Sequence, residues 1–475
     1  MTTIVFGTDG WRDRIADGYT VARVRRVARA YGQHVLDTKA GLVLVAHDTR
    51  FGGPMFQAAA ADVLQDLGLP VAVHQGPLPT PVLSFAVREL GAVGGVMLTA
   101  SHNPASDHGL KLKQAYGGTA TEATYHDVAA RTAALPDEPQ APRVRCDAER
   151  FDVREAYYRH LRGLLDLDVL LGWRGRLVHD AMHGAAAGWI AGFARWAELP
   201  WQVEPLRAAP DPTFGGSPPE PIPATLGALT RELASADAVG ALGVASDGDG
   251  DRLAVVPAGA APWTAHAVLA LLLDHLDRRG TPGRVVKTVT VSRLVERLAR
   301  SRGRQVVETP VGFKYLVEEL LRGGVMVAGE ESGGFGVCGH IPERDSILSA
   351  LLVTEALALG GVPLPERLAE LEREARWRHA FDRLDLRLDH PDELRRVLAR
   401  LEHDPEHFAG RPLASVERRD GVKLNLGDDR WVMLRASGTE PLLRVYAEGP
   451  DDAAVAELLA AARAFVDAVV QPTSG

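Results

Sequence analysis

Three short apolar runs, LVLVA at residues 42–46, PVAVH at 70–74 and GGVMLT at 94–99, have the length and composition of buried β-strands. The segments between them, residues 54–67 and 81–90, are long enough to form helices. Strands that alternate with helices in this way predict a parallel α/β sheet.

The alternation recurs twice along the chain. Strands at 176–180 and 239–245 flank an Ala-rich helix and predict a second α/β unit, and a third unit has predicted strands at 285–288, 305–308 and 325–329. The last hundred residues contain hairpin-like apolar runs and a final helix, which is typical of a smaller α+β domain. The 475 residues also exceed what one hydrophobic core supports. We therefore expect three successive mixed or parallel α/β domains and a C-terminal α+β domain, at 1–147, 148–256, 257–372 and 373–475.

The composition is that of an ordinary globular protein, with 46% hydrophobic and 24% charged residues. There are 53 Lys and Arg against 62 Asp and Glu, a net charge of -9, without a long block of one sign, so nucleic acid is not an expected partner. Cys146 and Cys338 lack the spacing of a disulfide framework or a zinc site. The N-terminus has no signal-like pattern and no apolar run approaches membrane-spanning length, so we expect a cytoplasmic protein without a membrane partner.

The segment TASHNP at residues 99–104 follows an apolar strand directly, at the carboxyl end where open α/β sheets bind ligands. This position makes Ser101 a candidate nucleophile, and His102, Lys111 and Lys113 are close enough in sequence to assist its hydroxyl. The alternative is that Ser101 only caps a turn before Pro104.

DGDGDR at residues 247–252 places three carboxylates at alternate positions after another predicted strand. Asp247, Asp249 and Asp251 offer hard oxygen donors without Cys or His, which is the ligand chemistry of Mg²⁺ and, second to it, Mn²⁺. Arg252 and Ala258, at the sixth and twelfth positions, exclude an EF-hand loop. The alternative is a solvated acidic turn, because Asp-Gly pairs are common in turns.

Two further loops carry polar groups suited to substrate binding. GEESGG at 329–334 follows an apolar strand and offers carboxylates and a hydroxyl to sugar hydroxyls, or else it starts a helix. RASGTEP at 435–441, with Arg444 beyond it, combines guanidinium groups, hydroxyls and glycine-exposed amides, the composition of a phosphate cradle. A hairpin loop with incidental arginines is the alternative for this second segment.

Five motifs follow one another along the chain in this order: FGTDGWR at 6–12 and the loops at Ser101, Asp247, Glu330 and Arg435. With these motifs the sequence resembles the alpha-D-phosphohexomutase superfamily (the phosphoglucomutase/phosphomannomutase family) along nearly the whole chain. The resemblance implies four domains around a central cleft, with an active form phosphorylated on Ser101. It implies that Mg²⁺ is held by that phosphate and by Asp247, Asp249 and Asp251. It also implies that the reacting groups are positioned or protonated by Arg12, His102, Lys111 and Arg252. The sugar and its phosphate would be bound by Lys287, Glu330, Ser332, Arg435, Ser437, Gly438, Thr439 and Arg444.

Two positions depart from the family pattern. Gly334 stands where phosphoglucosamine mutases and some other relatives have histidine, and His108 stands where many relatives have asparagine. No role of that loop histidine can be transferred to this chain. The strings ETPVGFK at 308–314 and HIPERD at 340–345 resemble the phosphoglucomutase branch, so glucose phosphate is the expected substrate.

The expected reaction is the interconversion of hexose 1-phosphate and 6-phosphate through phosphoserine and a hexose 1,6-bisphosphate, which also acts as activator. Lys111 or His102 would be the general base. Such an enzyme is an isomerase, an intramolecular phosphotransferase of carbohydrate metabolism, and is expected as a monomer or homodimer. Phosphomannomutase and phosphoglucosamine mutase are the alternatives for the sugar. A metal-dependent sugar phosphatase and a non-catalytic sugar-phosphate sensor are alternatives of a different class.

Overall fold

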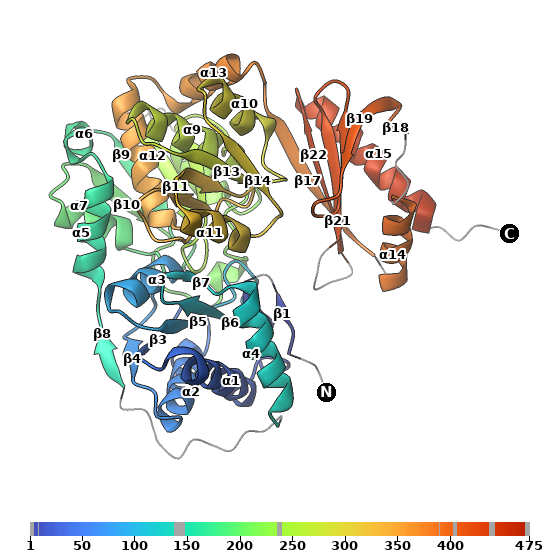
Figure 1. Cartoon of the computed structure of the whole chain (residues 1–475). Helices are drawn as coiled ribbons and strands as arrows, with labels where there is room; N and C mark the ends of the chain where they lie inside the picture. The colour runs from blue at the N-terminus through green and yellow to red at the C-terminus, as the bar shows by residue number, and fades with distance from the viewer. Residues whose placement is uncertain are drawn as a thin grey trace. The chain divides into compact units, whose positions relative to one another are not determined.

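A computed structural model describes residues 4–7, 9–136, 148–234, 240–388, 390–401, 406–436 and 442–470 (Figure 1). The chain divides into two compact units, Met1–Gly283 with Gly312–Arg367, and Arg284–Val311 with Leu368–Gly475.

The first sheet lies in the first unit and consists of β1 (Phe6–Gly7), β2 (Gly10–Arg14), β3 (Val43–His47), β4 (Val71–His74), β5 (Gly94–Leu98), β6 (Asp107–Gln114), β7 (Gly118–Thr119) and β8 (Glu149–Phe151). The strand order is β1-β2-β6-β5-β3-β4-β8, with β7 paired to β6. β3 is parallel to β4 and β5, whereas β6 is antiparallel to β5 and β2. The predicted parallel sheet is therefore mixed, because residues 99–106 are too few for a crossover and return the chain as a long hairpin.

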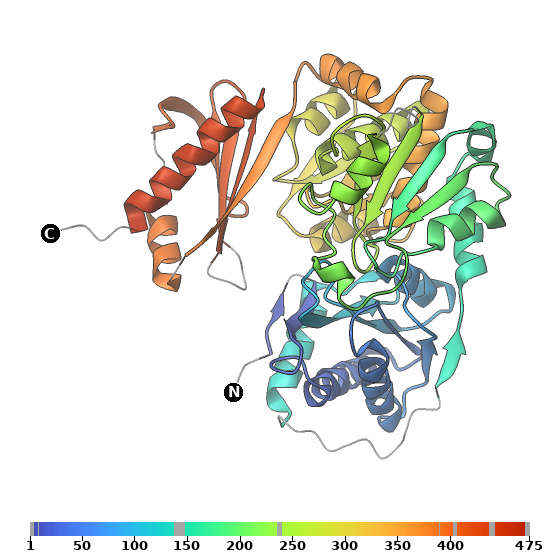
Figure 2. The same cartoon turned by 180° about the vertical axis from the view of Figure 1, so that it is seen from behind.

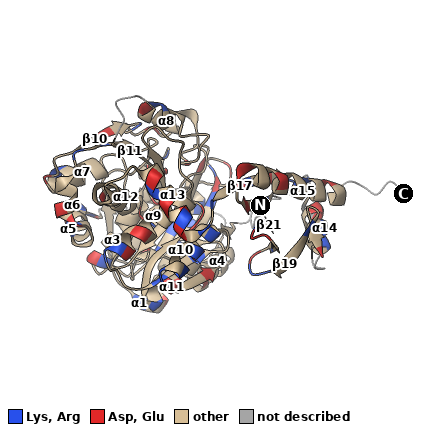
Figure 3. Ribbon diagram, turned by 90° about the horizontal axis from the view of Figure 1, so that it is seen from above, with Lys and Arg blue, Asp and Glu red and all other residues tan. Residues whose placement is uncertain are grey.

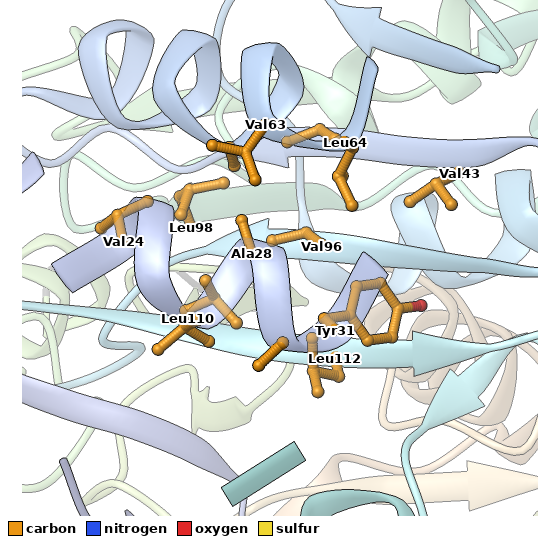
Figure 4. Close-up of a cluster of buried hydrophobic side chains, with 14 of the residues drawn as sticks. Val24, Ala28, Tyr31, Val43, Val63, Leu64, Val96, Leu98, Leu110 and Leu112 are labelled. Carbon is orange, nitrogen blue, oxygen red and sulfur yellow. The ribbon is translucent and has the colours of Figure 1, made fainter. Parts of the chain in front are cut away.

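The helices of this domain cover both faces of its sheet. They are α1 (Val21–Lys39), α2 (Gly53–Asp66), α3 (Thr80–Glu89) and α4 (Glu122–Ala134). In Figures 1 and 2, α1 and α2 lie on one face and α3 on the other. Figure 4 shows Val24, Ala28 and Tyr31 of α1 beside Leu110 and Leu112 of β6, all within one buried hydrophobic cluster. This core holds β5 and β6 together, and the loop with Ser101 joins these two strands.

The second sheet has the order β10-β9-β11-β12, from β9 (Arg176–Asp180), β10 (Gln202–Leu206), β11 (Ala241–Ser246) and β12 (Leu253–Pro257). β9 is parallel to β10 and β11, and β12 returns antiparallel to β11. The accompanying helices are α5 (Arg154–Leu164), α6 (Leu167–Gly172), α7 (Trp189–Trp196), the 3₁₀ helix η1 (Phe214–Gly216) and α8 (Gly227–Leu233). The short turn between β11 and β12 carries the three aspartates.

The third α/β region contributes to both units. In the first unit, β15 (Val325–Gly329) pairs antiparallel with β16 (Phe335–Val337), alongside α9 (Ala265–Arg278), α11 (Phe313–Arg322) and α12 (Ser346–Gly360). In the second unit, β13 (Arg284–Thr288) pairs parallel with β14 (Val306–Thr309), with α10 (Arg293–Ser301) between them in sequence. Helix α13 (Leu364–Ala375) follows α12.

The C-terminal sheet lies in the second unit and is antiparallel throughout its described pairs. Its order is β17-β22-β21-β20-β19-β18, from β17 (Ala380–Arg387), β18 (His407–Phe408), β19 (Arg411–Glu417), β20 (Val422–Leu426), β21 (Trp431–Ala436) and β22 (Leu442–Gly449). Helix α15 (Asp452–Val470) packs on β17 and β22, and α14 (Pro391–Arg400) packs on α15. The predicted fold class, three α/β domains followed by a smaller domain of different architecture, is confirmed.

Charge and hydropathy add two observations. Figure 3 shows Lys and Arg interspersed with Asp and Glu along the helices. Among the described residues, no single helix is long and apolar enough to cross a membrane, whereas α12 and α13 pass the length and composition test only as a bent pair.

Candidate active site

Ser101 lies in the turn between β5 and β6 and is 1% exposed. Its φ of 53° is left-handed, a conformation that non-glycine residues adopt only where surrounding contacts impose it. The Ser101 amide donates to Thr99 Oγ1 (2.8 Å), and its hydroxyl donates to Asp247 Oδ2 (2.9 Å). The turn therefore presents the Ser101 hydroxyl to a carboxylate of the second domain, which is more than a capping role requires.

The three aspartates converge at the carboxyl end of β11. One carboxylate oxygen from each of Asp247, Asp249 and Asp251 lies within 4.8 Å of the others, and all three residues are buried. Gly248 permits the close contact between this loop and the serine turn, because a Cβ there would lie 2.6 Å from the Ser101 carbonyl oxygen. Burial excludes the solvated acidic turn that the sequence left open.

The protein engages both oxygens of Asp247 but only one oxygen each of Asp249 and Asp251. Asp247 Oδ1 accepts the amides of Asp251 (2.9 Å) and Arg252 (3.1 Å). Asp249 Oδ2 accepts Thr80 Oγ1 (2.6 Å) and Lys111 Nζ (2.9 Å). Asp249 Oδ1 and Asp251 Oδ1, by contrast, are buried without a hydrogen-bond partner among the described residues. Two unpartnered buried carboxylate oxygens in an all-oxygen donor set fit a hard divalent cation such as Mg²⁺.

The electrostatics of the triad also fit a cation. Burial, with the neighbouring carboxylates of Asp251 and Asp249, raises the pKa of Asp247 well above its ordinary value. A divalent cation would relieve this repulsion and favour the ionised form.

Lys111 of β6 stands among three carboxylates, with Nζ 2.9 Å from Asp249 and Asp251 and 3.0 Å from Asp9. Burial lowers the pKa of Lys111, but Asp249, Asp251 and Asp9 outweigh it and raise that pKa above its ordinary value. In this geometry the Lys111 ammonium group donates hydrogen bonds to Asp249 Oδ2 and Asp251 Oδ2. Lys113, which the sequence also places near the serine, pairs instead with Glu343.

His102 and Arg12 adjoin the serine turn. His102 Nδ1 lies 3.3 Å from Ser101 Oγ. Burial, followed by Arg252 and Arg12, lowers the pKa of His102 well below its ordinary value, which favours the neutral imidazole. Arg12 of β2 donates through Nη1 to Asn103 Oδ1 (2.9 Å). Arg252 lies beside Asp251, with Nε 4.0 Å from Oδ1.

Glu330 and Ser332 lie in the turn between β15 and β16, so the alternative of a helix start is wrong. Glu330 is 5% exposed, and burial raises its pKa to about 7 although Arg344 lies nearby. The closest contact of the pair joins Glu330 Oε2 to Arg344 Nη1 at 3.4 Å. Ser332 is half-buried in the same turn.

Arg344 is a site residue that the sequence analysis did not single out, although HIPERD contains it. Its Nη2 donates to Asp9 Oδ2 and Asp251 Oδ2, both at 2.7 Å. A Cβ at Gly334 would lie 2.2 Å from Arg344 Cδ. The arginine therefore fills the space into which a larger residue at Gly334 would project. In the sequence, Arg344 stands between two acidic residues and just before α12. Neither feature indicates that its side chain binds a residue far away in the chain.

The phosphate-cradle candidates that the structure describes lie in the second unit. Arg435 of β21 and Arg444 of β22 are cross-strand neighbours. Asp420 accepts Arg435 Nε (2.9 Å), whereas Arg444 Nε is buried without a hydrogen-bond partner among the described residues. Two guanidinium groups in adjacent strand positions favour an anion between them, since like charges directly opposite destabilise a sheet.

The other residues predicted to bind substrate are Lys287, Ser437, Gly438 and Thr439. Ser437, Gly438 and Thr439 lie outside the described residues. Lys287 is 1% exposed, and its ammonium group donates to Glu308 Oε2 (2.6 Å) and to the Val291 carbonyl (3.2 Å) within the second unit.

Comparison with known proteins assigns the family. Models of the phosphoglucomutase/phosphomannomutase domains match in order, alpha/beta/alpha domains I, II and III and the C-terminal domain, at residues 3–138, 155–259, 264–374 and 386–465. These matches define the class as a phosphohexomutase, an isomerase that transfers a phosphoryl group intramolecularly. The chain belongs to the phosphoglucomutase/phosphomannomutase family of the alpha-D-phosphohexomutase superfamily, as its motifs predict.

Individual relatives carry different sugar names. A phosphoglucosamine mutase of Rhodospirillum centenum is 33% identical, over 99% of this chain and 97% of the relative. Another phosphoglucosamine mutase, from Variovorax paradoxus, is 31% identical over 95% of this chain and 96% of the relative. A crystal structure from Thermus Thermophilus, with the provisional name phosphomannomutase, is 41% identical with a TM-score of 0.89, over 98% of this chain and 99% of that chain. These names support a phosphohexomutase but not the expected preference for glucose phosphate.

Proposed function

We propose that the chain interconverts the 1- and 6-phosphates of a hexose through a phosphorylated Ser101, with glucosamine phosphate as the first substrate to test and mannose phosphate as the second. The observation that carries the proposal is the contact of the Ser101 hydroxyl with Asp247, beside two unpartnered carboxylate oxygens. The names of the relatives favour these two sugars over glucose.

The transfer step follows from the groups around Ser101. The bond between phosphorus and Ser101 Oγ breaks as a bond forms to the free hydroxyl of a sugar monophosphate, which gives a bisphosphate and a serine alkoxide that takes up a proton. The sugar hydroxyl must lose its own proton, and the imidazole of His102, with Nδ1 3.3 Å from Ser101 Oγ, is the candidate acceptor. After the bisphosphate turns end for end, its other phosphate returns to Ser101, and a free hexose 1,6-bisphosphate would load an unphosphorylated enzyme in the same way.

Asp247, Asp249 and Asp251, with the phosphate on Ser101, would hold Mg²⁺. The bound ion would supply neutralisation of charge on the phosphoryl oxygens.

Cationic side chains would stabilise the same oxygens from this chain. Lys111 is held in its charged form by the acidic residues around it, and Arg12 and Arg252 adjoin His102. Phosphoryl transfer depends on positioning and charge stabilisation more than on covalent assistance, so cations held beside the serine turn suit it.

Sugar and distal phosphate would be bound by different groups. Glu330 and Ser332 would contact ring hydroxyls. Arg435 and Arg444, with Ser437, Gly438, Thr439 and Lys287, would bind the phosphate that is not reacting. The domain limits 1–147, 148–256, 257–372 and 373–475 are part of this proposal, with one binding loop in each domain.

One assay tests the proposal. The enzyme is incubated with Mg²⁺, a trace of the matching bisphosphate, and the 1-phosphate of glucosamine, mannose or glucose, and both the 6-phosphate and inorganic phosphate are measured. We expect 6-phosphate without release of inorganic phosphate, fastest with glucosamine or mannose. Inorganic phosphate as the product would indicate a phosphatase, and binding without turnover would indicate a sensor; either result would contradict the proposal.

A further inference from the structure

Arg50 binds the turn that carries Ser101. The residue follows β3, and its side chain is 0% exposed. Through Nη1 it donates to the carbonyls of Pro104 (2.7 Å) and Asp107 (2.9 Å). Through Nη2 it donates to the carbonyls of Ser101 and Asn103, both at 2.6 Å. One guanidinium group thus donates hydrogen bonds to four backbone carbonyls of a turn that spans seven residues, 101–107.

A second set of contacts reaches the same turn from Asp48. Asp48 Oδ1 accepts the Arg50 amide (2.9 Å), and Asp48 Oδ2 lies 3.2 Å from Arg50 Nε. Thr99 Oγ1 donates to Asp48 Oδ2 (2.5 Å) and accepts the Ser101 amide (2.8 Å). The carbonyl and the amide of Ser101 are therefore both held, the first by Arg50 directly and the second by Thr99.

The surroundings make these contacts strong and specific. Arg50 and Asp48 are buried, and the ring of Phe214 covers the guanidinium group with its centroid 4.9 Å from Cζ. Hydrogen bonds from a charged donor strengthen in such a low-dielectric environment. Burial raises the pKa of Asp48 to about 6 although Arg50 opposes the shift, so the ion pair is retained at a desolvation cost.

Only an arginine can make this pattern. The guanidinium group presents five N–H donors in a planar fork, whereas a lysine has three donors on one atom and cannot reach two pairs of carbonyls. The backbone at Ser101 is left-handed, so the turn would relax if its carbonyls were released.

We propose that Arg50, with Asp48 and Thr99, is a positioning residue that fixes the Ser101 turn in the conformation that transfers the phosphoryl group. This inference rests on the proposed role of Ser101. Arg50 touches no reacting atom, so its loss should lower kcat and leave KM nearly unchanged. Misplacement of a reacting group by about 1 Å can cost roughly 100-fold in rate.

The experiment compares Arg50→Lys with the wild type and with Arg367→Lys as a matched control. Arg367 also pairs with a buried carboxylate, that of Asp274 (2.6 Å), in another part of the first unit. Steady-state kcat and KM are measured, together with the occupancy of phosphate on Ser101 after loading with bisphosphate. We expect Arg50→Lys to lose about 100-fold in kcat with KM within about twofold, and Arg367→Lys to retain wild-type kcat.

Chemical rescue provides a readout that a general loss of stability would not give. Millimolar guanidinium chloride should restore part of the kcat of Arg50→Ala, whereas equal sodium chloride should not. A wild-type kcat in Arg50→Lys, or a loss that appears only in KM, would overturn the inference. If neither Arg50 variant folds, Thr99→Val tests the inference in their place. A loss of kcat in Thr99→Val would support the inference, and an unchanged kcat would contradict it. Absence of phosphate from wild-type Ser101 would instead refute the proposed function.

Discussion

The Ser101 hydroxyl donates a 2.9 Å hydrogen bond to Asp247, a residue 146 positions later in the chain. The contact joins the turn after β5 to the turn after β11, so two domains must dock before the site exists. Both turns follow the carboxyl ends of strands, where open α/β sheets bind ligands.

Asp249→Asn should lower the affinity for Mg²⁺ and reduce turnover. Removal of a residue that only orients a metal ligand typically lowers metal affinity or activity roughly 10- to 100-fold. Asp249 would contact the ion directly, so its loss should cost at least as much. Mg²⁺ titrations of activity measure the effect, with Glu155→Gln as the control because the Glu155 side chain is exposed. Full activity of wild-type enzyme in metal-free buffer would contradict the assignment of the triad.

Gly248→Ala should separate the two turns. The new Cβ would lie 2.6 Å from the Ser101 carbonyl oxygen, a contact that forces one turn to shift. We expect a loss of about 100-fold in kcat with the fold retained. Gly163→Ala is the matched control, since a Cβ there meets nothing within 4 Å and the residue lies in α5. Equal rates for the two variants would show that the contact is unimportant.

Arg435→Ala and Glu330→Gln should separate phosphate binding from sugar selection. Removal of the guanidinium group should raise KM for every hexose phosphate alike, because all substrates carry the phosphate. Glu330→Gln should change the ratio of glucosamine to mannose phosphate turnover. The opposite pattern in the two variants would contradict the division of roles.

Glu448 should stabilise the second unit above about pH 4.3, the ordinary Glu pKa. Its carboxylate is 0% exposed and accepts Trp377 Nε1 (2.9 Å) and the Arg293 amide (3.1 Å), with Ser292 and Trp431 as further donors. Although burial raises the pKa of Glu448, His379 and Ser292 outweigh it and lower that pKa. The unfolded chain therefore binds the proton more readily, and stability falls as the pH drops below about 4.3.

Hydrogen exchange of peptides from the second unit, followed against pH, measures this effect. Glu448→Gln should lose about 1–3 kcal/mol at neutral pH, because one donor faces an amide instead of a carboxylate, and should lack the acid dependence. The same acid dependence in the variant would assign it to another group.

Local patterns predicted the strands well and their long-range contacts poorly. The apolar runs at β9 and β15 were predicted with the observed bounds, Arg176–Asp180 and Val325–Gly329. β6 was not predicted, because DHGLKLKQ places Lys111 and Lys113 in a strand that is buried on both faces. These lysines are tolerated there because they pair with Asp249, Asp251 and Glu343, partners more than a hundred residues away.

The candidate site was predicted as motifs, but the residues that hold it were not. Ser101 and the three aspartates come together as the motifs predict. Arg50 also follows a strand at its carboxyl end. Its side chain binds backbone carbonyls of the Ser101 turn, and no sequence pattern indicates such contacts. Arg344 likewise depends on Asp9, 335 positions earlier.

Phosphate on Ser101 tests the central claim most directly. Purified enzyme is incubated with glucosamine 1,6-bisphosphate and Mg²⁺, and intact-mass measurement is followed by peptide mapping, with Ser101→Ala in parallel. The account predicts one phosphate per chain on Ser101, its loss on incubation with hexose monophosphate, and no detectable turnover by Ser101→Ala. Phosphate on another residue, or undiminished activity of Ser101→Ala, would contradict it.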